Sequence, residues 1–260
     1  MNPVMTRYRV LAVLLGTAAL ASCEKNAVQD ITGSLPAAQI RFFNFGVNAP
    51  GVNFYANTTK MTAISSATGT EATTGVIYGG VGSGGLYAGI EPGQYTFSGK
   101  IAAATDKDLA ISNVQMSLEA GKRYSFYQSG FYNTTAKTVD AFIVEDPFPA
   151  TIDHSVALVR FVNAISNANA MTLYVKHTVS GVETAVGGAV AYKAAGAFTA
   201  LPGGSYDIST RYVGATTNAI TRTAVAFSPG RVYTITARGD ITVTSTTATN
   251  RPFLDNTVNR

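Results

Sequence analysis

The chain has 260 residues, enough for one large domain or two of ordinary size. Apolar residues make up 46% and charged residues only 13%, about half the ~25% typical of soluble globular chains. Its 13 Tyr and 13 Phe argue against a disordered chain, which lacks aromatics, and the low charge argues against a long-helix protein. The composition favours a β protein that works outside the cytosol.

Residues 1–22 are predicted to form a cleaved lipoprotein signal peptide. Arg7 and Arg9 give it a positive start, and the apolar run Val10–Ala21 is too short to cross a ~30 Å hydrocarbon core as a helix. Leu-Ala-Ser then precedes Cys23, which resembles the lipobox of bacterial lipoproteins, where the cysteine is diacylated. An ordinary secretory signal is the alternative, but Cys23 is the only cysteine of the chain.

Lipidation of Cys23 predicts a lipid bilayer as one partner, because two or three acyl chains anchor far better than one. Glu24 rather than Asp follows the cysteine, so the enterobacterial signal for inner-membrane retention is not expected. The predicted location is the bacterial cell envelope, at the outer membrane if the host has two. A lone cysteine forms no internal disulfide.

The rest of the chain repeats itself. Four blocks match in unchanged order: Ala38–Asn44 with Ala157–Asn163, Val52–Tyr55 with Met171–Tyr174, Tyr87–Phe97 with Phe198–Ile208, and Val114–Phe126 with Thr223–Ile235. This pattern indicates a tandem duplication. The predicted parts are a polar tether at 23–36, repeat one at 37–148, a linker at 149–154 and repeat two at 155–260.

The matched blocks have the pattern of β-strands. Val114, Met116 and Leu118 alternate with polar residues, which puts one face in a core and the other in water. Pro-Gly and Gly-Gly pairs supply the turns. About seven short strands per repeat predict an all-β fold of two tandem immunoglobulin-like antiparallel β-sandwiches. The Ala- and Gly-rich stretch 185–197 is compatible with a short helix, although its glycines disfavour one.

The crossing between the repeats is predicted to be stiff. Pro147 and Pro149 flank Phe148, and each Pro fixes its own φ and biases the preceding residue toward extended conformations. The two sandwiches are therefore expected to keep a restricted mutual orientation.

Each repeat opens with Arg-Phe-x-Asn, at Arg41–Asn44 and Arg160–Asn163, and later carries Pro-Gly-x-Tyr-type and Gly-x-x-Tyr turns. In these features the chain resembles the domain-of-unknown-function 4397 family over both repeats. The resemblance implies β-sandwiches of exported bacterial proteins, often in tandem and behind a lipobox, with no assigned activity. Asn44 and Asn163 stand where many members show His, and Asn169 stands where Pro50 predicts a Pro.

Little in the sequence suggests catalysis or metal binding. His154 in the linker and His177 after a strand have no partner at the spacing of zinc ligands. Two acidic pairs offer too few oxygens for calcium and are more simply solvated strand ends: Asp106 with Asp108, and Glu145 with Asp146. No catalytic residue, metal site or cofactor is predicted.

Two further patterns have ordinary interpretations. Gly80–Gly85 matches G-x-G-x-x-G, but no helix or parallel βαβ unit is expected there, so a flexible loop between strands explains it better. No Gly-x-Ser-x-Gly elbow precedes a helix, and a triad would need His154 or His177. An enzyme with an unrecognised site is the least favoured function.

Two residue pairs recur at matching positions, Arg41 with Arg160 and Tyr55 with Tyr174. Recurrence inside one chain reports what the shared fold needs, and paired strand residues suffice to explain it. A structural role is favoured for all four over a binding site.

The two repeats differ in net charge. Residues 23–154 carry 8 Lys and Arg against 11 Asp and Glu, whereas residues 155–260 carry 9 against 4. The combined excess of +2 is too small to indicate a nucleic-acid partner. One interpretation of the asymmetry is contact of repeat two with an acidic envelope glycan or lipopolysaccharide, and another is attraction between the repeats or between neighbouring molecules. Drift on a solvated surface explains it equally well.

The sequence thus predicts a membrane-anchored, non-enzymatic envelope lipoprotein, a binding or adhesion-type module that presents sandwich surfaces to a glycan or protein. Exposed Tyr and Phe are the expected contact residues. The alternative is a structural spacer or assembly subunit of the envelope whose edge strands pair with neighbours.

Overall fold

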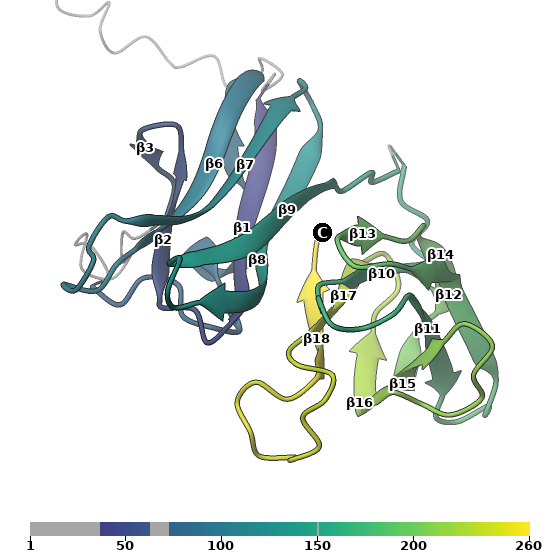
Figure 1. Cartoon of the computed structure of the whole chain (residues 1–260). Coiled ribbons are helices and arrows are strands. Elements are labelled where there is room, and N and C mark those ends of the chain that lie inside the picture. The colour runs from purple at the N-terminus through teal and green to yellow at the C-terminus, as the bar shows by residue number, and fades with distance from the viewer. Residues whose placement is uncertain (1–36, 63–72, 150) are drawn as a thin grey trace, which may run out of the picture. The chain divides into compact units, whose positions relative to one another are not determined.

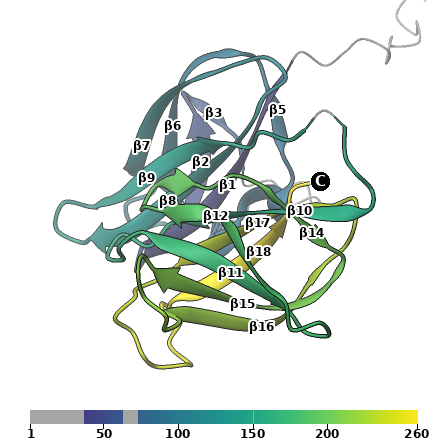
Figure 2. The same cartoon turned by 90° about the vertical axis from the view of Figure 1, so that its right-hand side faces the viewer.

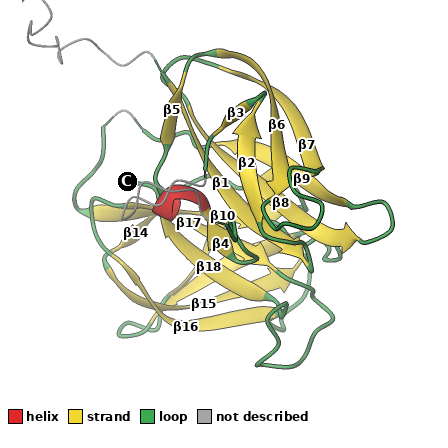
Figure 3. Ribbon diagram, turned by 90° about the vertical axis from the view of Figure 1, so that its left-hand side faces the viewer, coloured by secondary structure: helices red, strands yellow, loops and turns green. Residues whose placement is uncertain are grey.

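Strands make up most of the described chain. The computed structural model describes residues 37–62, 73–149 and 151–260 (Figure 1). The helical element among these residues is the short turn Gly82–Gly85, drawn in red in Figure 3. The predicted all-β fold is therefore confirmed, whereas the predicted signal peptide 1–22, the tether 23–36 and Cys23 lie outside the described residues.

Repeat one consists of two sheets that share a core. The first has the order β4-β1-β8-β9, with β5 also paired to β1, and the second has the order β3-β2-β6-β7. The strands are β1 Ala38–Val47, β2 Val52–Ala56, β3 Thr59–Lys60, β4 Gly80–Val81, β5 Ala88–Ile90, β6 Gly93–Ile101, β7 Ala110–Leu118, β8 Arg123–Asn133 and β9 Thr138–Glu145.

Repeat two has the same plan. Its sheets have the orders β13-β10-β17-β18, with β14 also paired to β10, and β12-β11-β15-β16; Figure 2 shows β11, β15 and β16 side by side. The strands are β10 Val156–Asn163, β11 Met171–His177, β12 Glu183–Val190, β13 Ala194–Ala195, β14 Thr199–Pro202, β15 Gly204–Tyr212, β16 Ile220–Phe227, β17 Val232–Arg238 and β18 Phe253–Val258.

The prediction of two tandem, mainly antiparallel sandwiches is confirmed, with one addition. In each repeat the first long strand pairs in parallel with a later one: β1 with β8, where Ile40 is opposite Tyr124, and β10 with β17, where Val159 is opposite Tyr233. Because parallel neighbours need a long crossover, the other sheet of each repeat is built between them in sequence.

The central strands are buried on both faces. In β1, Ile40 and Phe42 belong to the core of repeat one, where Phe42 stacks on Phe54 at 5.1 Å between ring centroids. The alternate residues Phe43 and Phe45 belong instead to a second cluster that also contains Val162 of repeat two. The run Ala38–Val47 is therefore almost continuously buried, unlike the strands that alternate apolar and polar residues.

The tyrosines of the recurring turn motifs fix those turns. Tyr124 and Tyr233 each accept a hydrogen bond at the hydroxyl from a backbone N–H five residues earlier, at Glu119 and Ser228. Tyr95 and Tyr206 each donate to a carbonyl four residues earlier, of Glu91 and Pro202. Each of the two bonds in repeat one thus has a counterpart at the matching position of repeat two, so the duplication preserved the chemistry of the turns.

The short helix considered for the stretch 185–197 is wrong. This stretch forms the end of β12 and the whole of β13, and Val186 pairs with Leu173 of β11. Buried Val186 and Val190 hold the strand on the core. Between them Gly187 has a φ of +67°, a left-handed conformation that suits glycine, where the pairing with β11 shifts register.

One connection differs strongly between the repeats. In repeat one, residues 134–137 join β8 to β9, whereas in repeat two residues 239–252 join β17 to β18. Loops of this length are uncommon in compact domains and are often functional. The loop is closed at its base, where the Asp240 N–H donates to the Asn250 carbonyl at 2.8 Å.

Gly239 is required at this base. Its φ is +111°, and a Cβ there would overlap the Arg251 carbonyl oxygen and come within 2.9 Å of the Asn250 oxygen. We expect Gly239→Ala to lower the free energy of unfolding by about 2–3 kcal/mol, because strained φ and a backbone clash combine. Urea denaturation measures the change.

Gly121→Ala is the matched control. Gly121 has a φ of +75°, and no described atom outside its chain neighbours lies within 4 Å of its Cβ position, so only the left-handed backbone costs energy, about 1 kcal/mol. Equal losses for the two variants would contradict a close approach at Gly239.

Candidate functional site

The recurring arginines lie buried between the two repeats. The described residues of the compact unit Pro36–Arg260 place both guanidinium groups at 1% exposure. Arg41 donates through Nε to Ser125 Oγ at 2.9 Å, through Nη2 to Asn259 Oδ1 at 2.8 Å, and through Nη1 to the Val258 carbonyl at 3.4 Å. Its own repeat supplies the serine, and the other repeat supplies the last two acceptors.

Arg160 makes the equivalent set of contacts in the opposite direction. Its Nε donates to Thr234 Oγ1 at 3.1 Å, its Nη1 to the Glu145 carbonyl at 2.8 Å, and its Nη2 to Asp146 Oδ1. Each arginine thus reaches the final residue of the last strand of the other repeat and the residue after it. We call this reciprocal set of side chains the arginine clasp: Arg41, Ser125 and Asp146 of repeat one, and Arg160, Thr234 and Asn259 of repeat two.

Asp146 is the one carboxylate in the clasp. It accepts from Ser125 Oγ at 2.7 Å and from the Tyr87 hydroxyl at 2.5 Å, and its Oδ2 lies 3.9 Å from Arg41 Nη2. Burial, followed by the charge of Asp146, raises the pKa of Tyr87, so this phenol stays protonated and donates. These contacts give Arg41 and Arg160 the structural role that recurrence predicted, and they show that the role is to join the repeats.

The charge asymmetry supplies pairs across the same boundary. In both ion pairs that join the described repeats, repeat two gives the cation and repeat one the anion: Arg160 with Asp146, and Lys193 with Asp140 at 2.6 Å. Tyr192 adds hydrogen bonds to Ser129 and Asp140. Attraction between the repeats, one of the interpretations of the asymmetry, therefore accounts for part of it.

Phe148, the last residue of repeat one, also contacts both repeats. The Phe148 ring lies 6.2 Å from the Tyr87 ring of repeat one and 6.2 Å from the Phe198 ring of repeat two, edge to face in both cases. Arg123 lies over Phe148 at 5.1 Å. The crossing is thus fixed by packing as well as by its prolines.

The recurring tyrosines have structural contacts. Lys100 of β6 lies 4.3 Å from the centroid of Tyr55, and Arg211 of β15, at the matching position, lies 4.2 Å from that of Tyr174. Both are diagonal cation–π pairs between neighbouring strands. Arg211 is held in turn by Glu183 at 2.7 Å, and this hydrogen-bonded cation lowers the pKa of Glu183.

The remaining candidates from the sequence have ordinary partners. The His177 Nδ1 accepts from the Val179 and Ser180 N–H groups of a turn. Asp106 pairs with Lys137 at 2.5 Å, and Glu145 pairs with Lys122 at 3.2 Å. Among the described residues, no group of three or more His, Cys, Asp or Glu side chains could hold a metal ion.

Two other sequence features are also structural. Asn44 is fully buried and bonds the Val76 and Pro50 carbonyls, and Asn163 bonds the Val190 carbonyl, so both asparagines tie neighbouring segments to the central strands. Gly80–Gly85 forms β4 and the helical turn before β5, with no helix of the kind that nucleotide binding needs.

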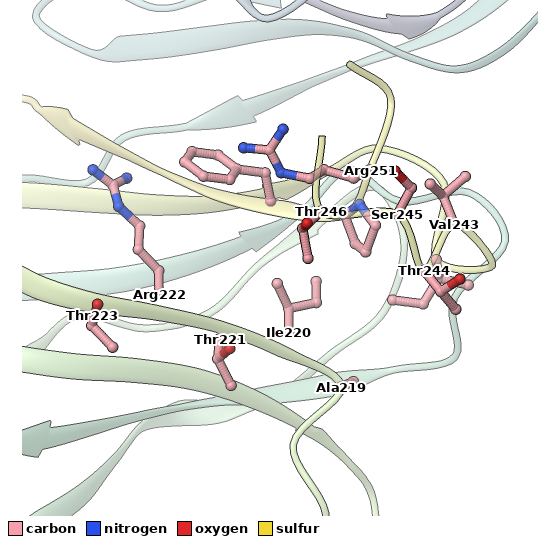
Figure 4. A pocket seen from close by; sticks show the side chains of 13 residues that line it. Ala219, Ile220, Thr221, Arg222, Thr223, Val243, Thr244, Ser245, Thr246 and Arg251 are labelled. Carbon is pink, nitrogen blue, oxygen red and sulfur yellow. The ribbon is translucent and has the colours of Figure 1, made fainter. Parts of the chain in front are cut away.

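A cleft of about 680 Å³ opens in repeat two, a size usual for ligand sites. It lies between β16, the edge of one sheet, and β18, the edge of the other, under the long 239–252 connection. In Figure 4, Arg222 lies toward one end of the cleft and Val243, Thr244 and Ser245 toward the other, and the Arg251 side chain runs from beside Ser245 toward the end with Arg222. Its lining comprises Ala219–Thr223, Ile241, Val243–Thr246 and Arg251–Phe253.

Polar groups in this cleft are of two kinds. Hydroxyl groups come from five Ser and Thr side chains, and positive charge comes from Arg222 and Arg251; none of the described lining residues is acidic. The sequence does not predict this site, because its residues come from three separate segments. The only local signal is the Ser- and Thr-rich stretch 242–249, which has no strand or helix periodicity.

No helix in the part of the chain described here combines the length and apolar character that crossing a membrane requires.

The geometry defines a class: a pair of duplicated β-sandwiches joined by buried charge, with an open cleft in the second repeat. The family model of the domain of unknown function DUF4397 matches residues 38–174 and 157–259. The chain belongs to this family, as the resemblance of its motifs predicted, and both repeats contribute to the match.

No curated protein matches the chain. Among solved structures, the Bacillus anthracis TIE protein is similar at 14% identity and a TM-score of 0.24, over 78% of this chain and 34% of that one. The chain thus spans about a third of that protein's length. A protein of Bacteroides ovatus ATCC 8483, named as a candidate cell adhesion protein, has 11% identity and a TM-score of 0.24, over 88% and 97% of the two chains.

The arginine clasp predicts that replacing its one carboxylate with an uncharged amide strongly destabilises the protein. We expect Asp146→Asn to lower the free energy of unfolding by about 3–5 kcal/mol, because it leaves two buried guanidinium groups without a carboxylate. Asn259→Asp places a carboxylate at the reciprocal position, 2.8 Å from Arg41. The double variant Asp146→Asn/Asn259→Asp should therefore recover most of the loss.

Chemical denaturation of the two single variants and the double variant measures this. Asp140→Asn is the control, since its pair with Lys193 is exposed and should contribute no more than about 1 kcal/mol. A double variant as unstable as Asp146→Asn alone would contradict a reciprocal clasp.

Proposed function

We propose that the protein is a non-enzymatic binding module of the bacterial cell envelope, anchored by lipid at Cys23, and that the cleft of repeat two is its ligand site. The observation that carries the proposal is the long β17–β18 connection, which covers the cleft of repeat two and is far longer than the β8–β9 connection of repeat one. Loops on a rigid scaffold are the usual place for binding residues, and the arginine clasp supplies the rigidity.

The lining favours binding over catalysis. A general acid or base near neutral pH is most often His or a carboxyl group with a shifted pKa. The described lining offers hydroxyl groups and guanidinium groups instead. A guanidinium group stays protonated in proteins and acts as a hydrogen-bond donor, so the cleft is suited to holding a ligand.

The arrangement changes the expected contact residues. Exposed Tyr and Phe were predicted to make contact, but among the described aromatics only Phe131 is counted as exposed, at 44%. The other described Tyr and Phe side chains are buried or half-buried. They pack in the cores, in turns or against cationic side chains. Hydroxyl and guanidinium groups of repeat two therefore replace aromatics as the proposed contacts.

The anchoring part of the proposal rests on the lipobox at Cys23. We expect Cys23→Ser to abolish incorporation of labelled palmitate and to move the protein from the membrane fraction to the soluble fraction. Protease shaving of intact cells then tests the side of the membrane. Release of repeat-two peptides, while a periplasmic control protein stays intact, is expected for a module that faces outward.

Protection until the outer membrane is broken would instead assign the module to the periplasm. Unchanged palmitate labelling of Cys23→Ser would overturn the anchor.

A cleft-filling variant tests the binding part. Thr221 is exposed and lines the cleft, so Thr221→Trp should reduce binding of the full-length protein, purified in detergent, to immobilised envelope polysaccharides and proteins at least tenfold. Thr134→Trp, on the exposed β8–β9 turn of repeat one, should bind as the wild type does. Equal binding by both variants, or concentration-dependent oligomers without any ligand, would favour a spacer or assembly subunit.

A further inference from the structure

Three guanidinium groups converge on one aromatic ring beside the cleft. Arg222, Arg238 and Arg251 lie 5.2, 5.3 and 5.4 Å from the centroid of Phe253. Each contact is a favourable cation–π pair, but like charges that share one ring repel one another. A concentration of positive charge of this kind is stabilised when an anion joins it.

One of the three charges is already neutralised. Arg238 Nε donates to Asp255 Oδ2 at 2.5 Å, and Asp255 shares the face of β18 with Phe253, two residues away. The charge of Arg222 also acts on this carboxylate, but less than that of Arg238. Burial raises the pKa of Asp255, and the charge of Arg238 opposes that rise. Asp255 therefore forms an ion pair within the protein, and Arg238 is its main partner.

The other two arginines keep most of their donors for a ligand. Arg222 Nη1 donates to the Leu254 carbonyl at 2.7 Å, and Arg251 Nη1 donates to the Ala248 carbonyl at 3.2 Å. Neither takes part in an ion pair among the described residues. A guanidinium group has five N–H donors, and one that is fixed at a single nitrogen presents its remaining edge for bidentate bonds to an oxyanion.

The hydroxyl groups of the cleft add neutral hydrogen-bonding partners next to this charge. Thr221 and Thr223 come from β16, and Thr244, Ser245 and Thr246 come from the long connection. A hydroxyl group donates one hydrogen bond and accepts others, which matches the hydroxyl groups of a sugar ring. The lining thus combines two oxyanion donors with several partners for sugar hydroxyls.

We propose that the cleft binds an acidic glycan, with Arg222 and Arg251 contacting its carboxylate or sulfate groups and the Ser and Thr residues contacting its ring hydroxyls. This inference rests on the proposed function and names the ligand class of the same site. It would also account for part of the excess of positive charge in repeat two, since two of its arginines lie in the cleft.

An acidic peptide is the competing ligand, and the edge of β16 argues against it. A peptide that adds to a sheet needs a continuous run of free backbone groups along the edge strand. Here the Arg222 side chain crosses from β16 to the Leu254 carbonyl of β18, and the 241–246 segment lies over the same edge. An extended chain therefore has no open length of strand to pair with.

The test measures binding of the full-length protein, purified in detergent, to four probes by isothermal titration calorimetry at low salt. The probes are an oligogalacturonate, a heparin oligosaccharide, a neutral malto-oligosaccharide of similar length, and an oligoglutamate peptide. We expect binding of one or both acidic glycans, with the two arms separating carboxylate from sulfate recognition. The affinity should fall at high salt because the contacts are partly exposed.

Arginine variants then locate the site. Arg222→Gln and Arg251→Gln should each weaken glycan binding about tenfold, the size of a lost charge-assisted contact. Arg231→Gln removes the same charge from an exposed position of repeat two outside the cleft and should leave the affinity within twofold. Because Arg222 also bonds Leu254, Arg222→Lys is included, which keeps the charge but loses the bidentate fork.

Several results would overturn the proposal: preference for the neutral glycan or the peptide, equal loss in Arg231→Gln, or no salt dependence. If Thr221→Trp still abolishes binding of some other ligand, the cleft is a binding site and only the ligand class is wrong. If Thr221→Trp changes no binding at all, the proposed function itself is wrong.

Discussion

The carboxylate of Asp146 is the point on which the two halves of the molecule depend. Removing a carboxylate from water costs several kcal/mol unless partners replace the lost hydration, and here Arg160, Ser125 and Tyr87 all donate to it. The donors come from three different parts of the chain. Their relative positions must be correct together, so the clasp fixes the register of the central strands as well as the contact between the repeats.

This constraint explains why the two sheets of each repeat differ in character. The sheets of β1 and β10 are covered on both sides, by a core on one face and by the other repeat on the opposite face, which is why Phe42 and Phe43 are both buried. The sheets of β2 and β11 instead end in the strands β7 and β16, where buried positions alternate with exposed ones because one face meets water. The open cleft lies where the sheet edges β16 and β18 meet, away from the clasp residues.

The sequence predicted what local pattern and internal repetition encode. The turn tyrosines, the alternation in β7 and β16 and the tandem sandwiches follow from spacing of residues in one segment, and they agree with the structure. The partners of Arg41 did not follow, because Val258 and Asn259 lie 217 and 218 residues away and no periodicity connects them. The cleft was not predicted for the same reason, because distant segments form it. The Ala- and Gly-rich β12 was not predicted either, because pairing with β11 and burial of its valines, and not its own propensities, make it a strand.

The reciprocal clasp also bears on self-association. Each repeat offers the same patch, an arginine and the residues after its last strand, to the other, which is the geometry of an isologous dimer interface. Duplication has placed both partners on one chain, so the effective concentration of one patch near the other greatly exceeds that of a second molecule. The protein is in this sense a covalent pseudo-dimer whose symmetry is broken by Asp146 opposite Asn259. The self-complementary surface around the arginine clasp is therefore buried between its own two repeats, and a different partner would contact other surfaces of the molecule.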